Sequence, residues 1–542
     1  MNSENQTISP GFSRMLVLAA ATLITAYGLF LSLGSQAGFP DSAFIAGRMP
    51  YLADKPLGED AFYMIHVAWN LASGHGPVCN EGCAVTGIQP LATLAYAMLA
   101  WVDIHLGGDK WTFLRLVLMF NVLLLLAFSE FVGRIAATLS TRQKRPAYCL
   151  GFLFSVFAFV AFRHFTLGLE TGLYLTALAA TMLFSLRHIP FQTLRCAVGL
   201  GVLAGTCGWC RIDFGVCFAV FLLAMLCGKM LTLKQCLISG SVAALIIAPW
   251  FVWVYSVSGS PMPSSGAAEF ELITRDNASL RLAAIKYAFV DGLVPWLFAG
   301  SRPAILDAKS LSLLIGLVVL AIWHRKLRGV IAGGRVWLGW MLAVAALASV
   351  YPTFFWSAHF YARYMAPLLI ITAAFSAVAG VTLAAGVLDR PRGVLAIGSL
   401  LCCMFAGQAF GSLHNHRSWF GYSVMAGFVQ RNLAHVKQVG AFQSGTMGFF
   451  NPNVVNLDGK VNPAVLPFIR NGQITAYIDN MEIGALVDWT YCLRTQYHLP
   501  ADWLAQKWYC STNKPDTSFI RCPADCYLRR SEPGEARSIG VQ

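Results

Sequence analysis

Charged residues are scarce in this sequence. Only 12% of its 542 residues are Asp, Glu, Lys or Arg, whereas 57% are hydrophobic, and the mean hydropathy is +0.60. Soluble domains are about a quarter charged. The shortage of charge therefore excludes an ordinary soluble protein and indicates a chain that crosses a membrane many times.

Several motifs of soluble enzymes are also missing. The sequence has no phosphate-binding loop, no zinc-ligand spacing, no dinucleotide-binding glycine pattern, no heptads and no internal repeat. The net charge of +13 would suggest a nucleic-acid partner if the protein were soluble. In a membrane protein, Lys and Arg held in cytoplasmic loops account for it, so we expect no nucleic-acid partner.

Apolar segments predict about eleven membrane-spanning helices. They are residues 15–33, 113–136, 147–162, 171–186, 196–209, 214–227, 237–255, 311–323, 337–350, 365–387 and 394–411. Basic residues recur in every second loop, and the positive-inside rule assigns those loops to the cytoplasm. The N-terminus is then cytoplasmic, and the odd number of spans puts everything after Ser412 outside.

The polar stretch 34–112 becomes the first external loop in this topology. Only one crossing fits between this loop and the basic residues near position 144, so the apolar part 90–106 is predicted as a helix in the outer membrane interface. The tail, 413–542, has no spanning segment, and its short β-rich runs predict a small α/β domain. We therefore expect a mainly α, polytopic membrane protein with a transmembrane module, 1–412, and an extracytoplasmic C-terminal domain, 413–542.

Cysteines outside the apolar segments are even in number. They are Cys79, Cys83, Cys492, Cys510, Cys522 and Cys526. An even set in polar regions is compatible with disulfides in an oxidising compartment, although the sequence does not give the pairing. Six free thiols are the alternative.

Polar and charged motifs gather on the predicted outer side of the membrane. They are Glu59-Asp60-Ala61-Phe62-Tyr63, the segment 70–76 with Asn70 and His75, Thr86-Gly87-Ile88-Gln89, Leu167-Gly168-Leu169-Glu170-Thr171, Arg211-Ile212-Asp213, the segment 259–265, Ala362-Arg363-Tyr364 and the segment 454–459 with Asp458. Any membrane protein has polar loops, which is the simplest explanation. Several of these groups, however, lie at the ends of spans, where an ionised side chain is costly unless it is used or paired.

Taken in order, these motifs resemble those of the C-superfamily glycosyltransferases, which are integral membrane enzymes using polyprenyl-phosphate-linked sugars. The first loop is most similar to the mycobacterial arabinofuranosyltransferase branch. Protein O-mannosyltransferases and lipid A aminoarabinose transferases are more distant relatives. Glu59 stands where the family usually has Asp, and Gln89 where it has Asn.

The resemblance implies a multi-pass enzyme of the bacterial cytoplasmic (inner) membrane, with its C-terminal domain in the periplasm. It would move a sugar from a polyprenyl-phosphate donor to a hydroxyl of a cell-envelope glycan, lipid or protein. Neither the sugar nor the acceptor follows from the sequence.

The carboxylates of the first loop suit this chemistry. Direct displacement of a polyprenyl phosphate inverts the anomeric centre and requires one carboxylate as general base. Asp60 is the candidate base, with Glu59 or Glu170 orienting the acceptor. Glu59 and Asp60 can also hold a divalent ion such as Mg²⁺, Mn²⁺ or Ca²⁺.

Two arginines can bind the donor phosphate. The fixed fork of Arg363 can donate two parallel hydrogen bonds to phosphoryl oxygens. Arg211 can do the same, although its spacing from Asp213 favours a structural ion pair.

Five further residues are substrate-binding candidates: Asn70, His75, Gln89, Tyr364 and Asp458. His75 lies between two glycines, so an exposed turn explains it as well as a sugar contact does. Asp458, with Asn456 and Lys460, can contact an acceptor glycan, but the same residues are ordinary in turns.

Other classes of protein share part of this pattern. A transporter or flippase of lipid-linked saccharide would need charged groups near the midplane of the membrane, and the short segments around Arg211 keep that possibility open. An O-antigen polymerase or ligase and a non-catalytic scaffold are the remaining alternatives.

Overall fold

A computed structural model gives the structure of the chain. It describes residues 8–35, 37–40, 52–54, 56–79, 84–141, 143–189, 193–271, 291–296, 333–354, 362–384, 387–388, 390–414, 421–497, 499–515 and 523–530. The predicted span 311–323, Cys83 and Cys522 lie outside these ranges.

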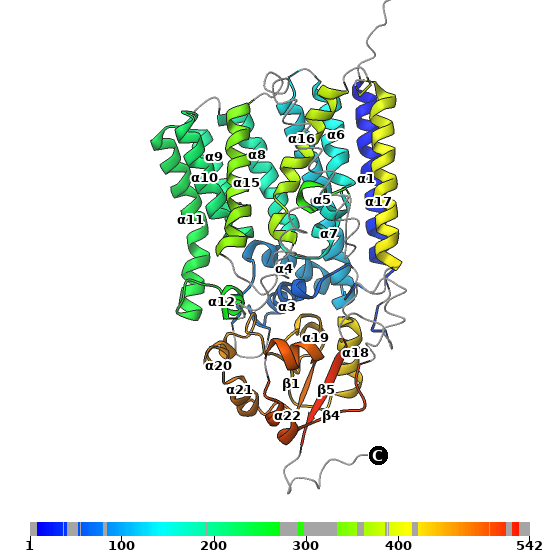
Figure 1. Cartoon of the computed structure of the whole chain (residues 1–542), viewed down its shortest axis with the longest axis vertical. Helices are drawn as coiled ribbons and strands as arrows, with labels where there is room; N and C mark the ends of the chain where they lie inside the picture. Colours follow the sequence, from blue (N-terminus) through cyan, green and yellow to red (C-terminus); the bar gives the residue numbers. More distant parts are fainter. Residues whose placement is uncertain are drawn as a thin grey trace, which may run out of the picture.

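Apolar helices of different lengths run side by side and form a bundle (Figure 1). They are α1 (Pro10–Leu33), α5 (Lys110–Leu139), α6 (Lys144–Val156), α7 (Phe159–Thr166), α8 (Thr171–His188), α9 (Leu194–Cys210), α10 (Phe214–Cys227), α11 (Leu233–Ser258), α15 (Gly334–Phe354), α16 (Leu368–Leu383) and α17 (Pro391–His414). Five helices in the described part of the chain are long and apolar enough to cross a membrane, or six if α6 and α7 count as one bent span. This architecture confirms a polytopic, mainly α membrane protein.

Every predicted span that falls within the described residues is helical. The span predicted at 147–162 is the exception in shape, because it is broken into α6 and α7 with a bend of 57°. The remaining short segments, α9, α10 and α16, are apolar helices of 10–17 residues. The structure thus supports the positions of the predicted spans, whereas their total of about eleven stays a prediction.

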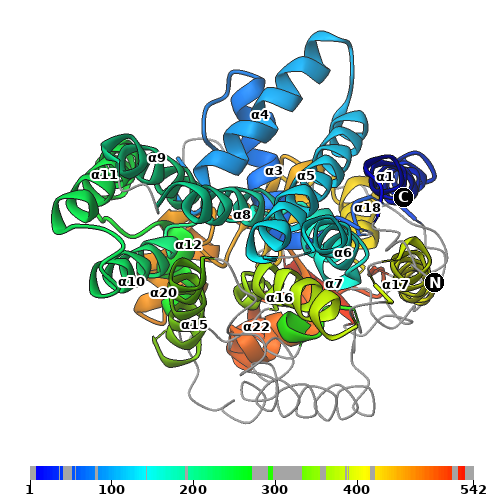
Figure 2. The same cartoon turned by 90° about the horizontal axis from the view of Figure 1, so that it is seen from above.

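Two helices of the first loop lie across the end of the bundle. These are α3 (Glu59–Ala72) and α4 (Pro90–His105), and α4 runs perpendicular to the bundle axis in the view from above (Figure 2). Its outward side chains include Met98 and Trp101, which are 72% and 54% exposed. Large exposed apolar residues on such a helix fit the predicted position in a membrane interface.

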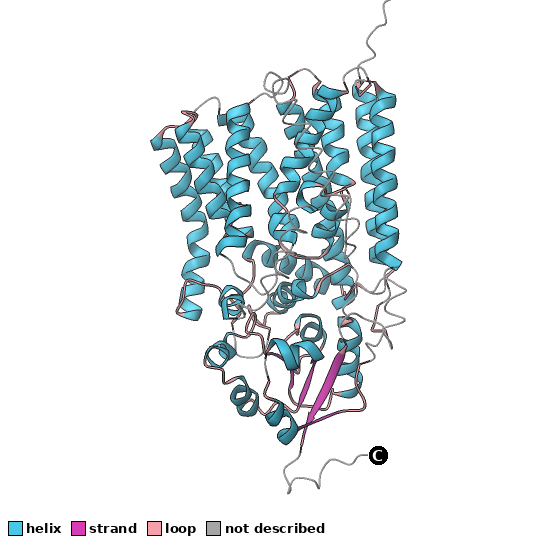
Figure 3. Cartoon of the chain, in the orientation of Figure 1, coloured by secondary structure: helices cyan, strands magenta, loops and turns pink. Residues whose placement is uncertain are grey.

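The C-terminal region folds into a small α/β domain below α3 and α4 (Figure 3). Its five-stranded sheet has the order β2-β1-β3-β5-β4. Strands β2 (Val454–Asn456), β1 (Val439–Ala441) and β3 (Ala485–Trp489) are parallel, and β5 (Ala524–Arg529) and β4 (Trp508–Cys510) continue the sheet antiparallel. Helices pack on both faces, as in α/β folds.

The alternation of side chains along the strands builds two separate cores. Val454, Val487 and Cys526 face α18 (Tyr422–Asn432) and α19 (Gly445–Phe450). Their neighbours Val455, Leu486 and Tyr527 face the opposite layer, with α20 (Leu466–Arg470), α21 (Ile474–Asn480) and α22 (Ala501–Lys507). This period of two is the ordinary consequence of strand geometry.

The predicted disulfides are not formed between the cysteines that the structure describes. No bond joins any two of Cys79, Cys492, Cys510 and Cys526. The thiol of Cys492 lies 3.5 Å from Gln496 Oε1, and that of Cys79 lies 3.9 Å from the carbonyl oxygen of Tyr63.

Candidate functional site

Two acidic residues before and at the start of α3 fasten the C-terminal domain to the membrane module. Asp54 accepts hydrogen bonds from the backbone N–H groups of Tyr422 and Ser423, at 3.1 and 3.0 Å. Glu59 accepts from the backbone N–H of Gly445 and from both the N–H and the hydroxyl of Thr446, the latter two at 2.9 and 2.6 Å. The two carboxylates therefore hold the first turns of α18 and α19.

Glu59 is consequently turned away from its neighbour Asp60. Its carboxyl group is buried, with a residue exposure of 7%, and burial raises its pKa to about 8, against the opposing hydrogen bonds from Thr446 and Gly445. The structure therefore gives Glu59 a docking contact, where the sequence predicted a place beside Asp60 for orienting the acceptor or holding a metal ion.

Asp60 lies between Arg363, which precedes α16, and Lys460 of the C-terminal region. Its Oδ2 accepts two hydrogen bonds from the guanidinium of Arg363, each 3.1 Å long. Arg363 belongs to a short 3₁₀ helix, Ala362–Met365, directly before α16. The structure thus brings together the predicted base and the predicted phosphate ligand from positions 303 residues apart.

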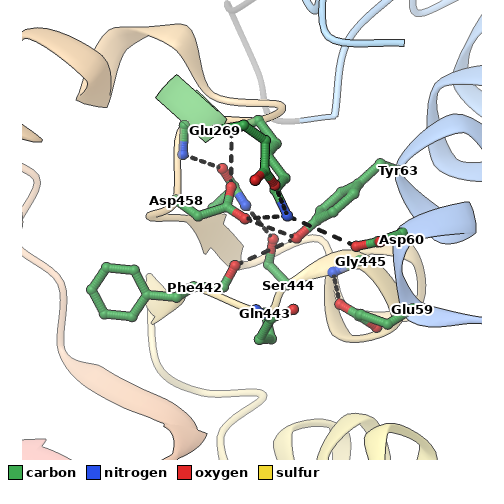
Figure 4. A network of polar contacts seen from close by, with 12 residues as sticks. Glu59, Asp60, Tyr63, Glu269, Phe442, Gln443, Ser444, Gly445 and Asp458 are labelled. Atoms are coloured by element: carbon green, nitrogen blue, oxygen red, sulfur yellow. Dashed lines mark hydrogen bonds and ion pairs between the residues drawn. The ribbon is translucent and has the colours of Figure 1, made fainter. Parts of the chain in front are cut away.

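The other oxygen of Asp60 points to a lysine that three carboxylates surround. Lys460 Nζ lies 3.8 Å from Asp60 Oδ1, 3.2 Å from Glu269 Oε1 and 3.8 Å from Asp458 Oδ2. We call these four residues the carboxylate–lysine cluster. Figure 4 shows Asp60, Glu269 and Asp458 converging from different ribbons, with Glu59 directed to Gly445 instead.

Asp458 is the most deeply buried member of this cluster. Its side chain is fully buried, its Oδ2 accepts a hydrogen bond from the Tyr63 hydroxyl at 3.3 Å, and its Oδ1 accepts one from the Lys460 N–H at 2.9 Å. Burial raises the pKa of the Asp458 carboxyl, and the Lys460 ammonium opposes that rise. Asp458 was predicted to bind substrate, and in the structure it is buried against Lys460 and Tyr63.

Three loops close one side of the cluster through backbone contacts. The hydroxyl of Ser264, the first residue of α12 (Ser264–Glu271), donates to the Lys460 carbonyl at 2.8 Å, and its N–H donates to the Thr86 hydroxyl at 3.1 Å. A Cβ on Gly87 would lie 2.1 Å from the Lys460 carbonyl oxygen and 2.6 Å from Ser264 Oγ. Only glycine fits at this position, so the motif around Thr86 and Gly87 serves close packing of the three loops.

The second polar group of the site surrounds Arg211. Its guanidinium donates to Glu170 at 2.6 Å, to Asp213 at 3.1 Å and to the Tyr351 hydroxyl at 2.6 Å. With Arg211 buried and two carboxylates beside it, the favoured structural ion pair with Asp213 is present, and Glu170 joins it. Arg211 and Glu170 were both predicted to contact substrate.

Tyr364 links the two groups. Its ring stacks on that of Tyr351, with centroids 4.6 Å apart and planes 9° from parallel, and the Arg211 guanidinium lies 5.7 Å from its centre. Tyr364 directly follows Arg363 in the chain. The network around Arg211 therefore packs against Tyr364, the neighbour of Arg363. We expect this network to hold Arg363 in place beside Asp60.

The remaining predicted residues of the first loop have other surroundings. Asn70 donates to the carbonyl of Val78 at 2.7 Å and so closes its own loop. His75 lies exposed between Gly74 and Gly76, whose φ angles are +82° and +85°, which is the turn that the sequence allowed as the alternative. Gln89 precedes α4, and its buried Oε1 has no hydrogen-bond partner within the described ranges.

Glu269 was not predicted to belong to the site, and Tyr63 was noted only as part of the motif that begins at Glu59. Glu269 is one of only 26 acidic residues in the chain and follows the matched segment 259–265 by four positions. The scarcity of acids was a signal, but nothing local connects Glu269 with Asp60 or Asp458. Tyr63 lies one helical turn from Asp60 and Glu59, so it shares their end of α3.

The divalent ion that the sequence allows finds no ligand set among the described residues. Such an ion needs several oxygen ligands about 2.0–2.6 Å from one point. The described residues include no group of three or more His, Cys, Asp or Glu side chains that could hold a metal ion. The carboxylates that do converge surround an ammonium group, and Glu59 is bound elsewhere.

The fold has relatives among solved structures. No protein-family model matches the chain, and no curated protein is similar to it in sequence. The archaeal oligosaccharyltransferase of Archaeoglobus fulgidus, in complex with an inhibitory peptide and a dolichol-phosphate, superimposes with a TM-score of 0.50 at 11% identity, over 97% of this chain and 75% of that one. Its apo form also gives 0.50 at 11% identity, over 91% and 73%. At this identity the likeness shows a shared fold.

Proposed function

We propose that this chain is a membrane glycosyltransferase that moves a sugar from a polyprenyl-phosphate donor to a hydroxyl group of a cell-envelope acceptor. The fold shared with an oligosaccharyltransferase supports a glycosyltransferase, and the dolichol-phosphate in that complex supports a lipid-linked donor. The motif resemblance is compatible with a hexosyl or a pentosyl group as the sugar, with arabinofuranose suggested by the most similar branch, and with an envelope glycan, lipid or protein on the periplasmic face as the acceptor.

One observation carries the proposal: Asp60, Arg363 and the carboxylate–lysine cluster meet where the bundle and the C-terminal domain face each other. A lipid-linked donor has an apolar tail that belongs in the membrane and a phosphate that belongs at its surface. A carboxylate beside a guanidinium at this boundary has the charges that the reaction needs at both reacting ends.

The proposed reaction is a single displacement. Asp60 takes the proton of the acceptor hydroxyl, whose oxygen attacks the anomeric carbon. The bond between that carbon and the phosphate oxygen breaks, and the polyprenyl phosphate leaves with the electron pair. The product has the inverted configuration, and one general base of this kind contributes about 10²–10⁴-fold to the rate.

Arg363 has two partners in this scheme. In the structure its two terminal nitrogens both donate to Asp60 Oδ2. A donor phosphate offers the same fork two oxygens of higher charge. Binding of the donor would therefore compete with Asp60 for the guanidinium, so that the donor phosphate and the base are coupled through Arg363.

The test is sugar transfer by the purified protein. Radiolabelled polyprenyl-phosphate sugars and membrane acceptors are incubated with the wild type, with Asp60→Asn and with Lys437→Met. Lys437 is a matched control because its side chain is 81% exposed and, among the described residues, its ion pair is with the exposed Glu482. We expect Asp60→Asn to lose about 10²–10⁴-fold in rate and Lys437→Met to keep the wild-type rate. Undiminished transfer by Asp60→Asn would refute the assignment.

The break between α6 and α7 and the buried Arg211 network favour one competing function. Broken helices and buried charges near a bundle are features of transporters, and the 57° bend supplies the first of them. A flippase would move lipid-linked saccharide across vesicle membranes and leave the sugar on its lipid. Translocation without transfer in the same preparation would select this alternative.

A further inference from the structure

The carboxylate–lysine cluster contains its own cation. The three carboxylates come from separate parts of the chain: Asp60 from α3, Glu269 from α12 and Asp458 from the loop after β2. All of them approach Lys460 Nζ within 3.8 Å. The Lys460 side chain is only 12% exposed, so water screens these charges weakly.

The described charges of the site favour a cation at this point. Asp60, Glu269 and Asp458 bring three negative charges, of which the guanidinium of Arg363 offsets one through Asp60. Like charges gathered in a partly buried place repel one another strongly unless an opposite charge lies between them. The ammonium of Lys460 lies between them.

The backbone holds Lys460 in this position. Its N–H donates to Asp458 Oδ1, and its carbonyl accepts from the Ser264 hydroxyl, at 2.9 and 2.8 Å. The preceding Gly459 has a φ of +84°, and its N–H donates to Asn456 Oδ1 at 3.0 Å. Lys460 therefore lies at the end of a turn that Asn456, Asp458 and Gly459 hold in shape.

We propose that the Lys460 ammonium is the resident cation of the site, that it takes the place that a divalent ion would otherwise occupy among these carboxylates, and that it positions Asp60. A metal ion and an ammonium cannot share this point, because both are cations and the oxygens stand at 3.2–3.8 Å from Nζ, which is ion-pair spacing. When Arg363 moves to the donor phosphate, Lys460 keeps its contact with Oδ1. The role of Lys460 in transfer rests on the proposed function, whereas its exclusion of a metal ion does not.

The first measurement is Mn²⁺ binding to the purified protein without any substrate. Electron paramagnetic resonance detects the bound ion. Wild type, Lys437→Met, Lys460→Met, Lys460→Gln and the double variant Lys460→Met with Asp458→Asn are compared, each with its melting temperature as a check of folding. We expect wild type and Lys437→Met to bind no Mn²⁺ at this site. A variant that lacks the ammonium should gain one site per chain, and the double variant should lose it again.

Two results would overturn the proposal. One is an Mn²⁺ site in the wild type that disappears in Asp60→Asn. The other is the absence of a gained site in both Lys460→Met and Lys460→Gln, when either is folded. Because no sugar enters this measurement, its outcome is independent of whether the protein is a transferase.

The second measurement is transfer itself. We expect wild-type activity to survive a chelator, Lys460→Met to lose about 10²-fold as electrostatic groups of active sites do, and Lys460→Arg or added Mn²⁺ with Lys460→Met to restore part of it. Wild-type activity that a chelator abolishes and Mn²⁺ restores would contradict the inference. If no preparation transfers sugar, the proposed function fails, and the Mn²⁺ result alone decides the role of Lys460.

Discussion

Glu59 and Asp60 are neighbours in sequence whose side chains perform different tasks. Successive residues of an α-helix point about 100° apart around the axis, because 3.6 residues complete a turn. One of the two carboxylates consequently reaches the C-terminal domain at Gly445 and Thr446, while the other reaches Arg363 and Lys460. Glu59 therefore makes a structural contact, and Asp60 is the candidate base.

The protonation of Glu59 gives a prediction about stability. Burial raises its pKa from the ordinary 4.5 to about 8 in the folded protein. Between those values the folded state binds a proton that the unfolded state has lost, so the stability that this group contributes is complete below pH 4.5 and falls as pH rises toward 8. Asp488, whose pKa burial raises to about 7, acts in the same direction.

Replacement of Glu59 by Gln should remove its part of this dependence. We expect Glu59→Gln to lower the slope of melting temperature against pH between 4.5 and 8, with the part due to Asp488 remaining. Glu482→Gln is the control, since Glu482 is 77% exposed. Melting curves in detergent across this range measure the effect. An unchanged slope in Glu59→Gln would show that the docking carboxylate does not titrate there.

Among the elements of the fold, the loop carrying Gly87 has the tightest packing around the site. An added Cβ would lie 2.1 Å from a backbone oxygen of Lys460, which cannot move without disturbing the turn that holds its ammonium. We expect Gly87→Ala to separate this loop from α12 and the Asn456–Lys460 turn, and to lower both transfer and melting temperature.

The matched control lies in α12 itself. A Cβ on Gly266 would meet its nearest neighbour, Met262 Cγ, at 3.4 Å, which is an ordinary contact. Gly266→Ala should therefore keep wild-type transfer and stability. Equal transfer rates and equal melting temperatures in Gly87→Ala and Gly266→Ala would contradict the tight packing inferred at Gly87.

The elements also show what the sequence could predict. Apolar runs of spanning length have few alternatives to a helix in a membrane, because lipid leaves backbone groups no other partners, and the predicted spans within the described ranges are helical for this reason. The break between α6 and α7 was not predicted, since Phe157 and Ala158 are as apolar as their neighbours.

Contacts across long sequence separations escaped prediction. Asp60 and Arg363 were selected because each belongs to a motif of recognisable type. Glu269 and the Lys460 ammonium acquire their importance only from folding, which brings positions 60, 269 and 460 to one point. Residue type and spacing do not indicate that these three positions come into contact.

At the scale of the whole molecule, the C-terminal domain and the first loop lie at the same end of the bundle (Figure 1). Lys110 Nζ, at the start of α5, donates to the carbonyl of Phe449 in α19 at 2.5 Å. At the opposite end of the bundle, Arg145 Nη1 lies 3.4 Å from the carbonyl oxygen of Ile8, beside the start of α1. The start of α5 and the start of α1 therefore lie at opposite ends of the bundle.

Basic residues distinguish these two ends. The helix ends on the side of Ile8 carry Lys144, Arg145, Arg187, Arg195, Lys229, Lys234, Arg335, Arg390 and Arg392. From the positive-inside rule we propose that this side faces the cytoplasm. Insertion with this side inward leaves Asp60, the carboxylate–lysine cluster and the C-terminal domain in the periplasm, where a lipid-linked donor and an envelope acceptor can meet.

This orientation can be measured with reporter fusions. A reporter active only in the periplasm should be active when fused after Gln542 and silent when fused after Ser140, which follows α5 on the basic side. A reporter active only in the cytoplasm should give the reverse pattern, and the two fusion points act as controls for each other's expression. Equal signals from both points would break the two-sided arrangement, and the opposite pattern would place the site in the cytoplasm, where the proposed acceptors are absent.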